Sequence, residues 1–428
     1  MFESLLTVDP ESSESDLIAC IAELERLKSA AAAAQARAAA AFDAARRAAE
    51  DAAGVPVAKR GRGVASEVAL ARRDSPSRGS RHLGFAKALV HEMPHTLAAL
   101  EQGQLSEWRA TLIVRESACL DVDDRQLLDA ELCGDPAGLE GMGDARVAAA
   151  AKAIAYRLDP HAVVDRAARA EADRMVTIRP APDTMAYLTA LLPVAQGVSV
   201  YAALRRAADT TFDGRSRGQV MADALVERTT GRSAAAATPI AVNLVLSDRT
   251  LLGGDTSPAD IAGYGPIPAE VARRLVMDAA MDPRSRAMLR RLYSHSKSGA
   301  LVKMESRARR FPRGLAAFIG LRDQRCRTPY CDAPIRHLDH ARPHARGGAT
   351  DAGNGQGSCA CCNYVKEAAG WRVATEIDET GRHTAEFTTP TGRAYRSTAP
   401  PLPGSMARVD ISEVEAAVEI TLSRLHAA

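Results

Sequence analysis

Apolar residues recur at alternating spacings of three and four along residues 14–53, which is the pattern of one long amphipathic helix. Leu17, Cys20, Leu24 and Leu27 lie on this stripe, and alanines from position 31 onward continue it. A heptad pattern of this kind favours packing against another helix, because only a facing helix buries the whole stripe. That partner is either a second copy of the chain or the chain's own helices, and the pattern leaves both open.

Shorter helical patterns fill residues 64–173, where glycines and prolines separate one from the next. Asp159 is expected to cap the helix that begins at Pro160, because aspartate accepts backbone N–H groups and proline lacks the donor that a first turn cannot use. Alternating patterns then predict small β elements among further helices. The predicted segments are a hairpin of 175–179 with 184–192, helices over 200–209, 216–229 and 269–280, and a buried strand over 240–246.

The C-terminal part begins with alternating residues that predict a hairpin of 372–377 and 383–388 around a turn at 378–382. Three prolines between 400 and 403 predict an extended linker. Apolar residues at helical spacing from Ile411 to Leu425 predict a closing amphipathic helix.

The composition is that of a globular protein of two or three domains. The chain has 428 residues, of which 46% are hydrophobic, 25% charged and only 4% aromatic, so alanine-rich helical cores are expected. No apolar run approaches the length of a membrane span, and the N-terminus lacks the basic and apolar regions of a signal peptide. With unpaired, scattered cysteines elsewhere, these features predict a cytoplasmic protein.

Two cysteine pairs lie between residues 326 and 362. Cys326 and Cys331 are five positions apart and Cys359 and Cys362 are three apart, with room for a small folded loop between the pairs. Two turns of this kind can place four thiolates in a tetrahedron, which is the arrangement of structural zinc sites. We therefore predict a zinc ion held by these four residues, with Cys361 as a bystander; the alternative is a set of ordinary buried thiols.

Polar residues of a different kind lie beside the cysteines. Asp339 and His340 are adjacent, and Asn363 directly follows the last cysteine. Carboxylate and amide oxygens suit Mg²⁺, and a histidine side chain titrates close to neutral pH, so it can act as a base. Asp339, His340 and Asn363 are therefore candidate metal ligands or bases within the proposed zinc-bound segment.

Asp339-His340, Gly347-Gly348, Asn354 and Cys359-x-x-Cys362-Asn363 with Lys366 together resemble the HNH endonuclease motif in its zinc-stapled ββα-metal form. The resemblance implies two antiparallel strands and a helix around one catalytic Mg²⁺ or Mn²⁺ ion. It gives His340 the role of general base and makes Asp339 and Asn363 the ligands of the ion. Asn354 would orient the His340 ring or tie down the loop. The implied products carry a 5′-phosphate and a 3′-hydroxyl.

The charge around the motif is strongly positive. Residues 303–346 contain eleven basic and four acidic side chains, whereas the whole chain carries a net charge of only +2. A local excess of this size favours a polyanionic substrate over a solvated helix face, because arginine binds phosphate with paired hydrogen bonds. The predicted nucleic-acid contacts are Arg327, Arg336, Arg342, Arg346 and Lys366.

The helical part of the chain is similar to a bacterial helical domain of unknown function that often precedes an HNH motif in a repeat family linked to mobile elements. The similarity rests on residues 97–106 and 216–226, and it assigns no catalytic residue. The fold class predicted from all patterns is mainly α with a small α+β module. The predicted segments are 1–53, the heptad-patterned helix; 64–235, the helical domain; 236–300, a connector with one strand and helices; 301–390, the HNH module; and 391–428, a proline-rich linker and amphipathic helix.

The function that these observations favour is a metal-dependent DNA endonuclease with structural zinc and catalytic Mg²⁺ or Mn²⁺. DNA is the expected partner, no membrane partner is expected, and a homodimer through the N-terminal helix is left open. One alternative is a zinc-stapled protein that binds DNA without cutting it. Another is an interaction protein in which the heptad helix dominates.

Overall fold

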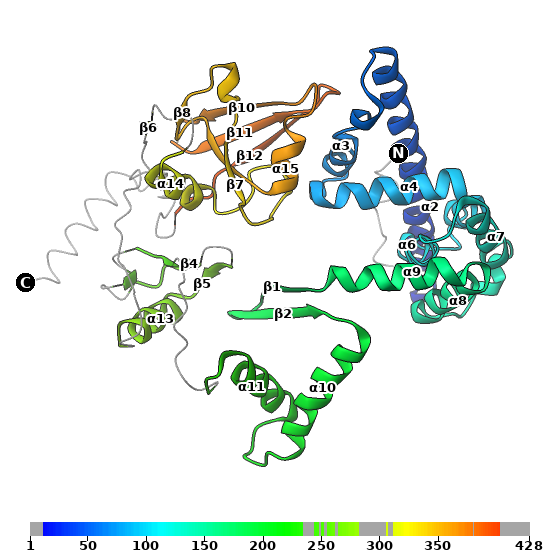
Figure 1. Cartoon of the computed structure of the whole chain (residues 1–428), viewed down its shortest axis with the longest axis horizontal. Coiled ribbons are helices and arrows are strands. Elements are labelled where there is room, and N and C mark those ends of the chain that lie inside the picture. Colours follow the sequence, from blue (N-terminus) through cyan, green and yellow to red (C-terminus); the bar gives the residue numbers. More distant parts are fainter. Residues whose placement is uncertain are drawn as a thin grey trace, which may run out of the picture. The chain divides into compact units, whose positions relative to one another are not determined.

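The computed structural model describes residues 12–233, 244–247, 250–251, 255–261, 264–281, 305–306, 311–379 and 381–402. The described chain is mainly helical, with small antiparallel sheets toward its C-terminal end, as the sequence predicts (Figure 1). It divides into two compact units, Met1–Arg174 and Met175–Ala428. The finer predicted segment bounds remain predictions, and the predicted C-terminal helix at 411–425 lies outside the described residues.

The first unit is a bundle of helices joined by short 3₁₀ turns. Its helices are α2 (Glu14–Ala52), α3 (Val64–Ala71), α4 (Gly79–Glu92), α5 (Pro94–Glu101), α6 (Glu107–Glu116), α7 (Val122–Cys133), α8 (Asp144–Leu158) and α9 (Pro160–Ala170). Its 3₁₀ turns are η1 (Val57–Lys59), η2 (Pro76–Arg78), η3 (Pro136–Leu139) and η4 (Glu171–Asp173). As predicted, the side chain of Asp159 caps α9 by accepting the backbone N–H of Ala162 at 2.8 Å.

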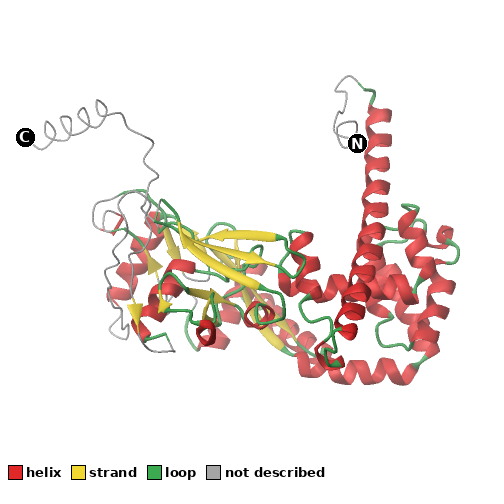
Figure 2. Ribbon diagram, turned by 90° about the horizontal axis from the view of Figure 1, so that it is seen from above, coloured by secondary structure: helices red, strands yellow, loops and turns green. Residues whose placement is uncertain are grey.

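The long helix α2 matches the predicted 14–53 segment almost residue for residue. Its C-terminal half belongs to the core of the first unit, where Ala33 and Ala36 are buried with Leu89 of α4 and Leu97 of α5. Alanine suits this position because it lets helices approach closely. For this half of α2, the packing partner is therefore the chain's own helices. The N-terminal half projects from the bundle (Figure 2) and exposes Ile18 and Ile21 at 67% and 62%.

The described residues of the second unit form helices and five small sheets. Its helices are α10 (Val194–Asp209), α11 (Arg217–Thr230), α13 (Ala269–Met281), α14 (Arg313–Asp323) and α15 (Ala360–Val365), with the 3₁₀ turn η5 (His344–Arg346). Its strands are β1 (Met175–Ala181), β2 (Met185–Leu191), β3 (Leu244–Val245), β4 (Ala259–Ile261), β5 (Gly265–Ile267), β6 (Glu305–Ser306), β7 (His337–His340), β8 (Thr350–Asp351), β9 (Gly355–Ser358), β10 (Arg372–Ile377), β11 (His383–Thr388) and β12 (Ala394–Thr398).

All pairings in these sheets are antiparallel. They join β1 with β2, β3 with β4 and β5, β6 with β8, β7 with β9, and β10 with β11 and β12. The hairpins predicted at 175–192 and 372–388 are confirmed. The third strand, β12, was not predicted; it ends where the prolines of the predicted linker begin. Of the strand predicted at 240–246, the described residues show β3.

The β7–β9 pair is the platform for the candidate site. His337 pairs with Ser358, Asp339 with Gln356 and His340 with Gly355. Helix α14 packs closely against Gly355, the partner of His340 in the sheet: a Cβ at Gly355 would lie 2.4 Å from the Ile319 side chain. Leu315 and Ile319 of α14 are fully buried there with Leu338 packed against them. None of the described helices combines the length and apolarity needed to cross a membrane.

Candidate functional site

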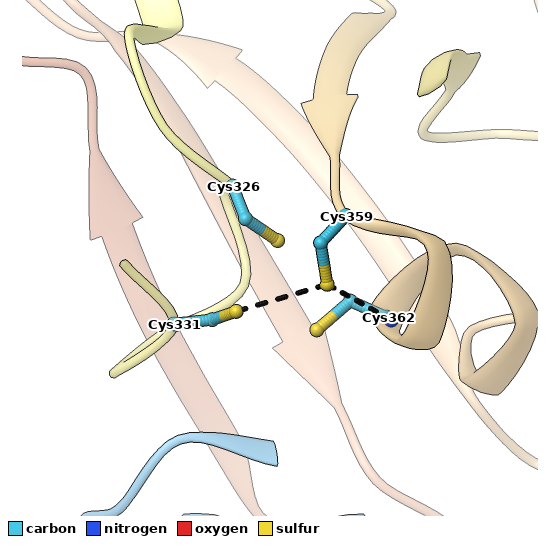
Figure 3. A group of neighbouring side chains, drawn as sticks. All are labelled: Cys326, Cys331, Cys359 and Cys362. Atoms are coloured by element: carbon cyan, nitrogen blue, oxygen red, sulfur yellow. Dashed lines mark hydrogen bonds between the residues drawn. The ribbon is translucent and has the colours of Figure 1, made fainter. Parts of the chain in front are cut away.

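The four predicted cysteine ligands converge in space (Figure 3). Cys326 and Cys331 come from the loop after α14, where the backbone N–H of Cys326 donates to Ala333 at 3.0 Å and that of Cys331 to Thr328 at 3.0 Å. Cys359 is the N-cap of α15 and Cys362 lies within that helix. All four sulfur atoms lie within 4.8 Å of one another and all four residues are buried.

The distances between the sulfur atoms fit a tetrahedral zinc ion. The Sγ atoms of Cys331 and Cys359 are 3.9 Å apart. Zinc–sulfur bonds of about 2.3 Å at tetrahedral angles require sulfur atoms about 3.8 Å apart. Cys361 is exposed and outside the cluster, as predicted. The described structure therefore contains a buried set of four thiols suited to zinc.

The four thiols of the cluster share hydrogen bonds and therefore shift one another's pKa. Hydrogen bonding from Cys326, followed by Cys331 and Cys362, holds the pKa of the Cys359 thiol well below its usual value. Hydrogen bonding with Cys326 correspondingly raises the pKa of Cys362. Without a metal ion, some of the four thiols keep their proton and others lose it. A divalent cation would stabilise all four as thiolates.

His340 ends strand β7, as the resemblance implied, in a tightly defined environment. Its Nε2 lies 2.8 Å from the hydroxyl of Thr350, its Nδ1 lies 3.6 Å from a carboxylate oxygen of Asp339, and its ring centroid is 4.6 Å from that of Phe311. The side chain is only 7% exposed. Burial lowers the pKa of His340, and the neighbouring Asp339 offsets this in part. The imidazole is therefore neutral near pH 7, as a base requires.

Asp339 is joined to helix α15 by Lys366. The ammonium group lies 2.9 Å from Asp339 Oδ2 and donates to the backbone carbonyl of His340 at 3.0 Å. Burial tends to raise the pKa of Asp339, but the hydrogen bond and charge of Lys366 hold it below its usual range. The side chain of Lys366 is only 3% exposed, so the predicted contact of Lys366 with nucleic acid is wrong. Its ammonium group instead binds the Asp339 carboxylate and the backbone of β7.

The two asparagines have different surroundings. Asn354 ties down the loop between β7 and β8, because its side chain accepts from Arg342 N at 2.8 Å and donates to Arg342 O and Ala349 O. Of its two predicted roles, the loop contact is the one observed. Asn363 lies inside α15, which begins three residues earlier than the resemblance implied. Its Oδ1 is buried without a hydrogen-bond partner in the described structure, three positions from Lys366 on the helix.

The predicted arginine contacts divide into two groups. Arg336, directly before β7, and Arg342 and Arg346, in the segment from β7 through η5, are exposed. Arg327 is buried and donates to the backbone carbonyls of His383 and Ser397. A phosphate cannot reach this guanidinium, so Arg327 is removed from the predicted nucleic-acid surface.

Two residues of the site were missed in the sequence. Thr350 holds the His340 ring, and nothing in its local sequence marks it, because the contact depends on the fold of the intervening loop. Gln356 pairs with Asp339 across the sheet, and its side-chain amide is fully buried without a partner in the described structure. A glutamine between two glycines in a predicted strand was the available signal.

The comparisons with known proteins concern mainly the helical part. No curated protein and no solved structure matches the chain. The family model "Domain of unknown function (DUF222)" matches residues 21–323, which confirms the predicted similarity of the helical part and ends before the first cysteine of the cluster. Because this match covers well over half of the 428 residues, the chain belongs to the DUF222 family.

Proposed function

We propose that the protein is a metal-dependent endonuclease of HNH type that hydrolyses DNA phosphodiester bonds. The observation that carries the proposal is the set at the β7–α15 contact: the neutral imidazole of His340, the carboxylate of Asp339, and the unpartnered Oδ1 of Asn363. A general base and oxygen ligands for a divalent ion are what metal-dependent hydrolysis of a phosphodiester requires. The four-cysteine cluster supports the set by fixing the N-terminus of α15 beside β7.

The oxygen donors fit a hard cation, because a buried carbonyl oxygen without a partner is costly unless a ligand occupies it. Asp339 and Asn363 would hold this Mg²⁺ or Mn²⁺ ion, which would supply stabilisation of negative charge on the phosphate. His340 accepts the proton of the attacking water, whose oxygen bonds to phosphorus as the bond to the 3′ oxygen breaks. Thr350 and Phe311 hold the imidazole in place. The products are a 5′-phosphate and a 3′-hydroxyl.

A second candidate function is DNA binding without cleavage. It is favoured by the ion pair of Lys366 with Asp339, which occupies one carboxylate oxygen, and by the burial of His340. In this alternative the zinc-bound fold only displays Arg336, Arg342 and Arg346 to phosphates. The two candidates differ in whether the bound DNA is cut.

The test is cleavage of supercoiled plasmid by zinc-loaded full-length protein with and without added Mg²⁺ or Mn²⁺. Omitting the divalent ion, rather than adding a chelator, leaves the zinc cluster intact. His340→Ala should abolish cleavage, whereas His337→Ala on the same strand should retain it. For the wild type, the rate should rise with pH through a midpoint below 6.5, because burial lowers the pKa of His340.

Nicked or linear plasmid with the wild type and His337→Ala, but not with His340→Ala, supports the proposal. Plasmid that is bound but uncut under every ion condition supports the second candidate. Cleavage that survives His340→Ala refutes the assignment of the base.

A further inference from the structure

Helices α3 and α4 of the first unit are joined by a turn of four residues, 72–75 (Figure 1). The 3₁₀ turn η2 runs directly into α4, so the second helix effectively starts at Pro76, which supplies the fixed φ of a first helical residue. A helix of eight residues, a four-residue turn and a longer second helix is the order of elements in a helix-turn-helix.

The two helices are locked closely together. A Cβ at Gly79 would lie 2.0 Å from the backbone carbonyl oxygen of Ala65, so only glycine permits this crossing. The turn is held by hydrogen bonds from Arg73 N to Leu70 O and from Asp74 N to Ala69 O, at 3.0 and 2.9 Å. Arg73 has a φ of 56°, in the left-handed region where glycine or asparagine is usual. The left-handed conformation holds Arg73 at the turn between the two helices, where its side chain is exposed.

The charge of this segment is positive, and its acidic side chains are already paired. Residues 59–87 contain eight basic and two acidic side chains. Glu67 is buried and binds Arg46 at 3.0 Å, and Asp74 lies 2.8 Å from His82 and 3.4 Å from Arg78. Arg73 and Arg81 are exposed, and no carboxylate of the described chain pairs with either. Carboxylates from outside the segment also pair with Arg60, Arg72 and Lys87. Arg73 and Arg81 are therefore the exposed cations of this surface on which the proposal rests.

The first half of the second helix has a sharply divided surface. Leu83, Ala86 and Leu89 face the core. The opposite side exposes small or basic residues, namely Ser77, Arg78, Ser80, Arg81 and Gly84. At Gly84 no atom lies within 4 Å of the place a Cβ would occupy. This side has no bulky apolar side chain to bury in a protein interface. Its hydroxyl and guanidinium groups can donate hydrogen bonds, and its small side chains allow close approach to a groove of DNA.

We propose that α3 and α4 form a helix-turn-helix that docks on duplex DNA, with the first half of α4 in the major groove. The major groove of B-form DNA admits one α-helix, and the N-terminal residues of a second helix reach the base edges. Arg81 and Ser77 lie on the groove side of the helix, and Arg73 in the turn contacts a flanking phosphate. This inference does not rest on the proposed nuclease activity, since binding through α4 requires neither His340 nor the zinc cluster.

The test is the affinity of full-length protein for a fluorescent B-form DNA duplex of about two helical turns, followed by anisotropy. The measurement uses the His340→Ala background without Mg²⁺, so that no DNA is cut. Arg336→Gln, Arg342→Gln and Arg346→Gln are added in a parallel series, so that the exposed arginines of the second unit do not mask the effect. Circular dichroism melting checks that each variant is folded.

The variant Arg73→Asn/Arg81→Gln should weaken binding about tenfold or more and lower the slope of log K against log salt by about two, because two cationic contacts are lost. Asparagine keeps the left-handed conformation that residue 73 requires. The control Arg146→Gln/Lys152→Gln removes two charges from α8 of the same unit and should leave affinity unchanged. Gly84→Glu, which places a carboxylate on the proposed contact face, should weaken binding without lowering the melting temperature, because glutamate favours a helix more than glycine does.

Equal affinities of the double variant and the control, in both series, overturn the proposal. So does tighter binding to an RNA duplex than to DNA, because the narrow major groove of A-form RNA does not admit a helix. DNA binding that depends on Arg73 and Arg81 in a protein that never cuts plasmid keeps this inference and refutes the nuclease proposal.

Discussion

The buried ion cluster at the end of α14 gives a sharp test of what holds the second unit together. Asp323 accepts hydrogen bonds from Arg322 at 2.7 and 3.2 Å and from the backbone N–H of Gly357 at 2.7 Å, and it lies 3.7 Å from Arg327. The three charged side chains are 7% exposed or less. Through the two arginines this carboxylate connects α14 with the residues around β9 and with the β11–β12 pair.

Asp323→Ala should destabilise the unit by about 4 kcal/mol. Breaking a buried ion pair costs about 3–5 kcal/mol, because the remaining charge is left desolvated. Here two guanidinium groups lose their counter-ion, and burial already lowers the pKa of Arg327. The orphaned N–H of Gly357 adds about 1–3 kcal/mol, and the two losses overlap because they share one side chain. Asp323→Asn keeps an acceptor for Gly357 and should cost about 1 kcal/mol less.

The assay is urea unfolding at fixed free zinc, followed by tryptophan fluorescence. The chain has two tryptophans, Trp108 in the first unit, which is 56% exposed, and Trp371 in the second, which is 6% exposed. A Trp108→Phe background therefore reports the second unit alone. Asp332→Ala removes an exposed carboxylate of the same loop and serves as the control. A loss below about 1 kcal/mol for Asp323→Ala, the size expected of a surface pair, would refute the reasoning.

Three further predictions follow from single features. Cys359→Ser should lower bound zinc from about one ion per chain to near none, with Cys361→Ser unchanged, as measured by elemental analysis; equal zinc contents would contradict the assigned ligands. Burial lowers the pKa of His383 to about 4. The free energy of unfolding should therefore fall by about 3 kcal/mol as pH drops from 6.5 to 4, because the unfolded chain binds the proton first. Urea unfolding of wild type and His383→Gln checks this, and an equal dependence of the unfolding free energy on pH in the two proteins would contradict it. Pairing of two copies through the N-terminal half of α2, which we propose because Ile18 and Ile21 are exposed there, predicts that Ile18→Glu/Ile21→Glu halves the mass measured by light scattering. An unchanged mass argues against that pairing.

Local patterns were sufficient wherever one element's own periodicity defined it. Helix α2 was predictable because its apolar spacing runs unbroken from Leu17 onward, and the β10–β11 hairpin because alternation on both sides brackets a turn at 378–382. Strand β12 was missed, since the prolines that follow it dominated the interpretation and its pairing with β11 is a tertiary contact. The four-cysteine cluster was predictable because a short spacing within each pair brings its two thiols together locally.

Charge counting failed where burial decided the role of a residue. Arg327 and Lys366 are basic residues beside a motif, and the sequence alone treats them like Arg336 or Arg346. The structure separates them, because Arg327 neutralises Asp323 and Lys366 neutralises Asp339 from different elements. Which arginine meets water and which meets a carboxylate depends on packing between segments, and no local spacing encodes that.

The small net charge of the chain conceals a segregation of charge that bears on both proposals. Residues 59–87 and 303–346 each carry a large positive excess, while the whole chain is only +2, so the remaining residues are strongly acidic on balance. The exposed arginines that the proposals use are Arg73 and Arg81 in the first segment and Arg336, Arg342 and Arg346 in the second, and we call these two sets the basic surfaces. Local positive charge in a chain that is acidic elsewhere favours binding of phosphates at these two surfaces. If both surfaces bind one DNA molecule, removing either set of arginines lowers the salt slope by its own number of contacts, and removing both lowers it by the sum. If only one surface binds, the second removal changes nothing, so the two series of arginine variants decide how many of the basic surfaces meet DNA.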